Sequence, residues 1–146
     1  METRAGEANF AEIGRLSLEK LFEIQGTVQT PMVVFEKDGI IQVQRPSIEE
    51  EDIEKLHSSL LYSIVDLVRR LKLSELFVGY EGFYLVEEGE TAVRILVGTF
   101  YSDEEEKVWI AQIHGKAIGE WQDISDNHSR FGFEGLWKLA KSYLRN

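Results

Sequence analysis

The sequence predicts a single α+β domain in which two strands precede a long helix and three strands follow it. An Asp-Gly pair at 38–39 separates two apolar runs, an unbroken helical pattern covers 47–72, and a strand-rich run punctuated by glycine covers 76–101. A further helix is expected before and after this set, an order typical of α+β domains. A chain of 146 residues is long enough for one domain with a real core.

The chain begins with a mixed segment, residues 1–15, which we expect to be flexible. A first helix is then predicted to begin at Ser17, whose side chain can act as a partial N-cap, and to end at Gly26. Its apolar face contains Leu18, Leu21 and Phe22, and Leu16 or Ile24 can join them.

A hairpin is predicted next, because glycine at 39 tolerates the positive φ of a tight turn after Asp38. Residues 32–35 are apolar without interruption, which is typical of a central strand covered on both faces. Residues 41–44 alternate between apolar and polar, as an edge strand covered on one face does.

The organising element is a helix over residues 47–72. Ser47 is the expected N-cap, and Glu50 three residues later completes a capping box. One stripe of apolar residues recurs at helical spacing and a second stripe widens it: Ile53, Leu56, Leu60, Ile64, Leu67 and Leu71, then Leu61, Val65 and Val68.

This apolar arc covers about half of the helix circumference, more than a helix needs to lie on a sheet. We therefore expect two contacts, one with the chain's own sheet and one with a second helix. A deep groove within the monomer is the alternative. Leu61, Val65 and Val68 are expected near a partner chain. The opposite, polar arc is a candidate docking platform for another protein and contains Lys55, Ser58, Ser59, Tyr62, Asp66, Arg69 and Arg70.

Three strands are predicted after this helix, at 76–80, 83–87 and 91–101. Glu81-Gly82 and residues 88–90 are the expected turns. The last strand is the longest and most apolar, so we expect it to be central.

A helix is predicted over residues 108–124, although Gly115 and Gly119 lie inside it and each costs about 1 kcal/mol relative to alanine. After a break near 126–129, a last helix is expected. The predicted division is a flexible N-terminus (1–15), a domain (16–125) and a C-terminal helical extension (126–146).

No catalytic constellation is visible. The three histidines, His57, His114 and His128, lie in separate elements without metal-ligand spacing, cysteine is absent, and no phosphate-binding glycine loop occurs. We expect no enzymatic activity, no metal and no cofactor.

The net charge of −10 argues against nucleic acid or an anionic membrane surface as the main partner. No apolar run is long enough to insert in a membrane, so we expect a soluble cytoplasmic protein.

The element order, with the hairpin MVVFEKDGIIQVQ, the capped helix 47–72 and the run YEGFYLVEEGETAVRILVGTF, resembles the roadblock / dynein light chain family. The run ETAVRILVGTF followed by KVWIAQIHGKAIGE is similar to the bacterial MglB-type branch. The likeness covers about residues 15–125.

The resemblance implies a profilin-like, five-stranded antiparallel sheet of order 2-1-5-4-3. The long helix would lie on one face, and the first helix and the helix over 108–124, which are the N- and C-terminal helices of the family pattern, on the other. The last helix, after Ser129, is an extra C-terminal helix beyond that pattern, and we expect it to be either a cap on the sheet or a partner-binding arm. It also implies a homodimer in which the long helices pair and the third strands join through Leu76, Val78 and Tyr80.

Such dimers are non-enzymatic regulators or scaffolds of Ras-like small GTPases, and some stimulate GTP hydrolysis. Two other functions stay open: an acidic, secretion-type chaperone that binds an unfolded client segment, and a small-ligand sensor. Exposed apolar surface on the sheet would favour the chaperone, and a deep pocket with convergent polar groups would favour the sensor.

Overall fold

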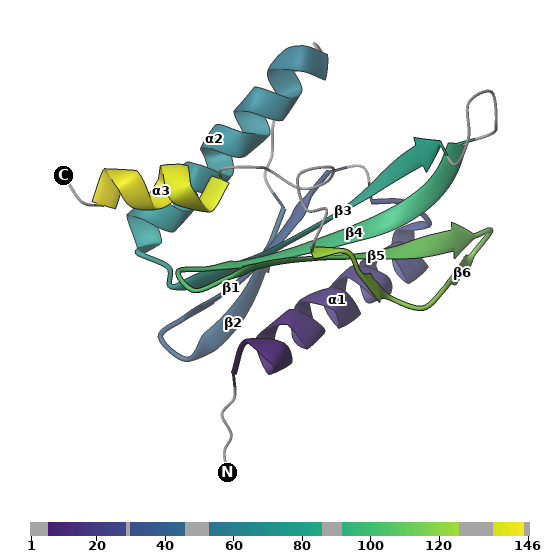
Figure 1. The fold of residues 1–146 in the computed structure, drawn as a ribbon, viewed down its shortest axis with the longest axis horizontal. Coiled ribbons are helices and arrows are strands. Elements are labelled where there is room, and N and C mark those ends of the chain that lie inside the picture. The colour runs from purple at the N-terminus through teal and green to yellow at the C-terminus, as the bar shows by residue number, and fades with distance from the viewer. Residues whose placement is uncertain (1–5, 29, 46–52, 86–91, 126–135, 145–146) are drawn as a thin grey trace.

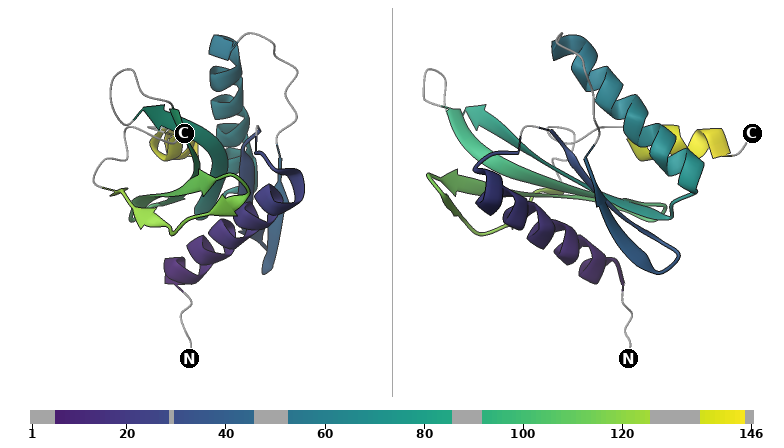
Figure 2. Two further views of the ribbon diagram at one scale, coloured as in Figure 1. Left: turned by 90° about the vertical axis from the view of Figure 1, so that its right-hand side faces the viewer. Right: turned by 180° about the vertical axis from the view of Figure 1, so that it is seen from behind.

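The computed structural model describes residues 6–28, 30–45, 53–85, 92–125 and 136–144. An antiparallel sheet has α1 against one face and α2 with α3 against the other (Figure 1; Figure 2). The elements in chain order are α1 (Gly6–Gln25), β1 (Met32–Lys37), β2 (Ile40–Gln44), α2 (Ile53–Leu71), β3 (Glu75–Leu85), β4 (Ala92–Ser102), β5 (Glu106–His114), β6 (Ala117–Ile118), β7 (Gln122–Asp123) and α3 (Leu136–Leu144). The α+β class predicted from the sequence is therefore confirmed.

The first helix is longer than predicted. It begins at Gly6, so Ser17 lies inside it and does not cap it, and residues 6–15 belong to the helix. Its predicted end is confirmed, because Gly26 has a φ of 75° and its N–H donates to the Phe22 carbonyl at 2.6 Å.

The predicted hairpin is confirmed. Asp38 and Gly39 have φ values of 55° and 80°, the signs that a type I′ turn requires, and Lys37 pairs with Ile40 across the turn. The apolar run 32–35 is buried on both faces of the sheet, as predicted.

The predicted strand number and order are wrong. In the described residues seven strands pair in the order β2-β1-β3-β4-β5-β6, with β7 pairing β5, in place of the five strands in the order 2-1-5-4-3 that the resemblance implies. The strand that follows α2 pairs directly with β1, and hairpin connections then place β4 and β5 in turn. The apolar strand β4 is central, as predicted.

Residues 81–82 do not form a turn. They continue one strand, β3, whose pairing with β4 runs without a break from Glu75 to Leu85. The Glu81 carboxylate accepts hydrogen bonds from elsewhere in the chain, which favours an extended backbone at this Glu-Gly pair. The second expected turn, at 88–90, lies outside the described residues.

The helix predicted over residues 108–124 is also wrong, because this segment forms β5, β6 and β7. Both faces of β5 are covered: Val108 and Ile110 pack on one side and Trp109 and Ile113 on the other. A strand covered on both faces has no polar alternation, so its apolar residues matched a helical period by coincidence. Gly115, with a φ of 65°, makes the turn that ends β5.

The helix α1 approaches the sheet closely because glycine occupies contact positions. A Cβ on Gly14 would overlap the ring of Phe77, and one on Gly98 would lie 2.7 Å from the same ring. Phe77 is fully buried in a core that contains Leu18 and Phe22 of α1.

The other face of the sheet is covered by α2 and α3 together. Buried residues of α2, such as Ile64 and Val68, share a core with Leu136, Trp137 and Ala140 of α3. The last helix was expected either to cap the sheet or to form a partner-binding arm, and α3 packs on the face of the sheet that α2 covers. The helix expected on the opposite face, over residues 108–124, is absent there because this segment forms strands. The predicted N-cap Ser47 and Glu50 lie outside the described residues.

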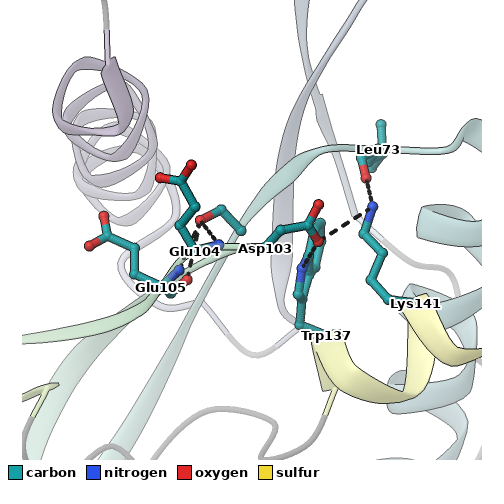
Figure 3. Close-up of polar contacts among 7 residues, drawn as sticks. Leu73, Asp103, Glu104, Glu105, Trp137 and Lys141 are labelled. Atoms are coloured by element: carbon teal, nitrogen blue, oxygen red, sulfur yellow. Dashed lines mark hydrogen bonds and ion pairs between the residues drawn. The ribbon is translucent and has the colours of Figure 1, made fainter.

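Polar contacts fix α3 to the turn between β4 and β5 (Figure 3). The indole Nε1 of Trp137 donates to Asp103 Oδ1 at 2.9 Å, and Lys141 Nζ donates to the Leu73 carbonyl at 2.6 Å. Lys141 also lies 4.7 Å from the Trp137 ring centroid. The C-terminal extension is therefore part of the domain core.

Among the helices of the described part of the chain, none has the length and apolar character needed to cross a membrane.

Candidate binding surface

The outer face of α1 carries apolar side chains that the sheet does not cover. Phe10, Leu18 and Phe22 face the sheet and are buried. Leu16 and Ile24, by contrast, are 56% and 72% exposed, and Ile13 is also exposed. At 100° per residue Ile24 and Ile13 lie beside the buried stripe and Leu16 lies further around the helix, so α1 carries apolar side chains over more of its circumference than its contact with the sheet uses.

A groove of about 490 Å³ runs between this face of α1 and the end strand β2. Its lining residues are Ile13, Leu16, Ser17, Lys20, Leu21, Ile24, Met32, Val43 and Arg45. The described part of the chain has eight exposed large apolar side chains, and four of them line this groove. A fifth, Ile41, lies two residues from Val43 on β2 and therefore on the same face of the sheet. This concentration marks the groove as an interaction surface.

Two cations, Lys20 and Arg45, lie along this apolar groove. Arg45 is held in place, since its guanidinium donates to Gln25 Oε1 at 2.9 Å and to the Thr30 carbonyl at 3.0 Å. In a chain with a net charge of −10, this pair gives the groove a local charge opposite to that of the molecule. The groove therefore favours an acidic group next to apolar ones.

The C-terminal end of α1 is tied to the sheet by Glu81. Its carboxylate accepts from the Thr27 hydroxyl at 2.9 Å and the Val28 N–H at 3.1 Å, and it forms an ion pair with Arg94 at 2.8 Å. Burial raises the pKa of Glu81, but the hydrogen bonds from Arg94, Val28 and Thr27 together lower it below its ordinary value. This network fixes one end of the groove wall.

Further contacts hold the other side of α1. The Trp121 indole donates to Glu19 at 2.9 Å, and the Arg15 guanidinium lies 4.4 Å from the Trp109 ring centroid. Burial lowers the pKa of Arg15, against the attraction of Glu12 and Glu19.

A second hollow, of about 250 Å³, lies beside Arg15. Its lining residues include a positive charge, Lys107, and two negative charges, Glu12 and Glu105. Its mixed charges and small size make it a weaker candidate site than the groove.

The polar face of α2 predicted to bind a partner is exposed where the structure describes it. Ser58, Tyr62, Asp66, Arg69 and Arg70 are exposed and Ser59 is half-buried, while the Lys55 side chain lies outside the description. Asp66 and Arg70 form an ion pair at 3.7 Å, one helical turn apart. These residues share one helix face but do not surround a deep cavity.

Most of the residues predicted at a dimer interface are buried within the monomer. Val65, Val68, Leu76 and Val78 are at most 2% exposed and belong to the core under α2 and α3. Leu61 packs against this same core, and Tyr80 packs against a smaller cluster on β4 and β5. The second helix expected against α2 is therefore α3 of the same chain.

The described part of the chain bears on the metal-ligand and histidine expectations. It holds no group of three side chains able to bind a metal ion. His114 is exposed at the end of β5, while the His57 side chain and His128 lie outside the description.

Searches of family models, of curated proteins and of solved structures found no match to this chain.

Sequence reasoning missed this groove because it considered Leu16 or Ile24 only as an addition to the buried face of α1 and not as a separate exposed surface. The available signal was the second apolar stripe at 13, 16 and 24, which continues the buried stripe around the helix. A second signal was β2, where Ile40, Ile41 and Val43 occur without a single charged residue.

Proposed function

We propose that this protein is a non-enzymatic binding protein of the chaperone type, which holds an extended apolar segment of another polypeptide in the groove between α1 and β2. The observation that carries this proposal is the gathering of Ile13, Leu16, Ile24 and Val43 around one open groove. These four large apolar side chains are exposed to water. A partner that covers them would gain roughly 25 cal/mol of binding free energy for each Å² of apolar surface buried.

The rest of the surface supports the same proposal. A net charge of −10 keeps such a protein soluble although it exposes an apolar patch. The groove is shaped by α1, whose inner face lies in the core, and by β2, which is held by its pairing with the buried strand β1, so it does not depend on the client for its form. A preformed surface of this kind lowers the entropic cost of ordering an extended client.

The test uses peptides selected from a random display library on the full-length protein and then measured by fluorescence anisotropy. We expect this selection to yield apolar peptides. Their affinity for the Leu16→Asp or Val43→Asp variant should be about tenfold or more lower than for the wild-type protein, because each change places a charge in the apolar contact. The control is Tyr62→Ala, at an exposed residue of α2, which lies on the opposite face of the sheet from α1. This variant should bind the peptides with wild-type affinity. Equal affinity of all three variants would contradict the proposal.

A second candidate function uses the polar face of α2. We also propose binding of a Ras-like small GTPase there, supported by Tyr62, which is 60% exposed beside the Asp66–Arg70 ion pair. An exposed aromatic ring next to arginine is the composition that binding hot spots favour. This candidate has less support, because the strand order differs from the one that the family resemblance implies.

Charge reversal separates the two candidates. Arg69→Glu, which leaves Arg70 beside Gln44 unchanged, should weaken capture of a small GTPase from the same genome and leave groove peptides bound with wild-type affinity. Unchanged capture of the GTPase would eliminate this second candidate.

A further inference from the structure

The strand β2 has one main-chain edge that pairs with nothing in the described part of the chain. It is the end member of the sheet, and β1 is its only neighbour there. In a two-residue hairpin the residues that flank the turn exchange hydrogen bonds, here Lys37 and Ile40, and every second pair does the same. Gln42 and Gln44 therefore bond inward to β1, while the N–H and C=O groups of Ile41 and Val43 point outward.

Within the described residues 40–44, this open edge lacks three of the devices that protect edge strands. Edge strands are usually shielded by lysine, proline or a bulge, because an exposed row of donors and acceptors pairs with other chains. Residues 40–44 contain no charge and no proline, and their pairing with β1 runs without a bulge. The edge is therefore able to accept another strand.

The residues with free main-chain groups are also the ones that face the groove. Val43 lines it, and Ile41 shares its side of the sheet. Side chains directly opposite one another on paired strands lie on the same face. A strand added to β2 would thus direct every second side chain over the apolar groove.

The intervening side chains of such a strand would lie on the other face, beside Gln42 and Gln44. A hollow of about 110 Å³ on that side is lined by polar groups of Gln44, Ser63, Asp66 and Arg70, as well as by apolar ones. A segment that alternates between apolar and polar residues matches both faces.

We propose that the client segment binds as an added strand on β2, with apolar residues at every second position over the groove and an acidic residue beside Lys20 and Arg45. This inference rests on the proposed chaperone-type function and specifies the sequence class of its client. Main-chain hydrogen bonds would provide the affinity, and the groove would determine which client sequences bind, as in other cases of strand addition.

The charges favour a foreign segment over a second copy of this chain. Within residues 40–44 a second β2 carries no carboxylate of its own that could face Lys20 and Arg45. Each copy also carries a net charge of −10, which opposes close self-association.

The test measures amide hydrogen exchange by NMR on the full-length protein, with a blocked peptide of roughly ten residues as the probe, a length that covers one strand and its flanks. Valine and threonine alternate in the peptide, and two aspartates end it. Saturation should slow exchange of the Ile41 and Val43 amides by about fivefold or more each, as expected for new hydrogen bonds of about 1 kcal/mol. The Gln42 and Gln44 amides should be protected already in the free protein.

A second peptide, N-methylated at the residues that face β2, tests the same step without altering the protein. We expect it to bind at least about tenfold more weakly, since it cannot donate to the Ile41 and Val43 carbonyls. If the parent peptide binds, Leu16→Asp weakens it, and yet N-methylation and amide exchange show no effect, strand addition is overturned while the groove function stands. If neither the probe nor any selected peptide binds, both fail. Protection of Ile41 and Val43 without peptide, together with dimers in sedimentation, would show a second copy as the occupant and overturn the proposal.

Discussion

The helices α1 and α2 lie on opposite faces of one sheet, and each has more apolar surface than its contact with the sheet covers. The surplus on α2 is covered by α3 of the same chain through Leu136, Trp137 and Ala140. The surplus on α1 is left open, with Leu16 and Ile24 more than half exposed beside an open strand edge. A wide apolar arc thus indicates that a helix has a second contact, but it does not say whether the chain itself provides that contact.

The difference between the covered surface of α2 and the open surface of α1 is tested most strongly by placing the same charge on each helix. Val68→Asp on α2 should cost about 4 kcal/mol or more, because it buries an unpaired carboxylate at a fully buried site. Leu16→Asp on α1 should change the free energy of unfolding by no more than about 0.5 kcal/mol, since the side chain is already exposed. Urea unfolding measures both. Equal destabilisation by the two substitutions would show that the α1 surface is not free.

The role of α3 as the internal cover of α2 is tested at Trp137. Trp137→Ala should cost about 3–5 kcal/mol through the cavity that it leaves. Trp137→Phe keeps most of the volume but removes the bond to Asp103, and should cost about 1 kcal/mol. Thermal unfolding of the two variants measures both losses of stability and shows how much larger the loss with alanine is than the loss with phenylalanine. A negligible loss with alanine would mean that α2 does not depend on α3.

The attachment of α1 should depend on pH through Glu81. Because folding lowers the pKa of Glu81, its contribution to stability is complete above its ordinary value of 4.5 and is lost as the pH falls through the lower folded value. Glu81→Gln should cost about 1–2 kcal/mol at neutral pH and flatten the loss of stability below pH 4.5. Urea midpoints between pH 3 and 7 check this. A variant with the wild-type pH profile would show that the network does not hold α1.

The sequence was sufficient where local chemistry decides the structure. The Asp38-Gly39 turn, the buried run 32–35 and the end of α1 at Gly26 were all predicted, because glycine with positive φ and unbroken apolar runs act locally. The long helix and its need for a second contact were predicted from its apolar arc.

The sequence failed where distant contacts decide. Both faces of β5 are covered, by α1 on one side and by a small cluster on the other, which removed the alternation that marks a strand. The Glu81-Gly82 pair became part of a strand because Thr27, Val28 and Arg94 bind its carboxylate from distant segments. The groove was missed for the same reason, since the exposure of Leu16 depends on how α1 is turned against the sheet.

The most direct test of the account is methyl NMR of the full-length protein with a soluble nitroxide. Relaxation of each methyl group then reports its access to solvent, without any ligand. We predict strong broadening of the Leu16, Ile24 and Val43 methyl signals and none for Val65 or Val68. Protection of Leu16 and Val43 equal to that of Val68 would contradict the account, because it would mean that the groove between α1 and β2 is already covered in solution.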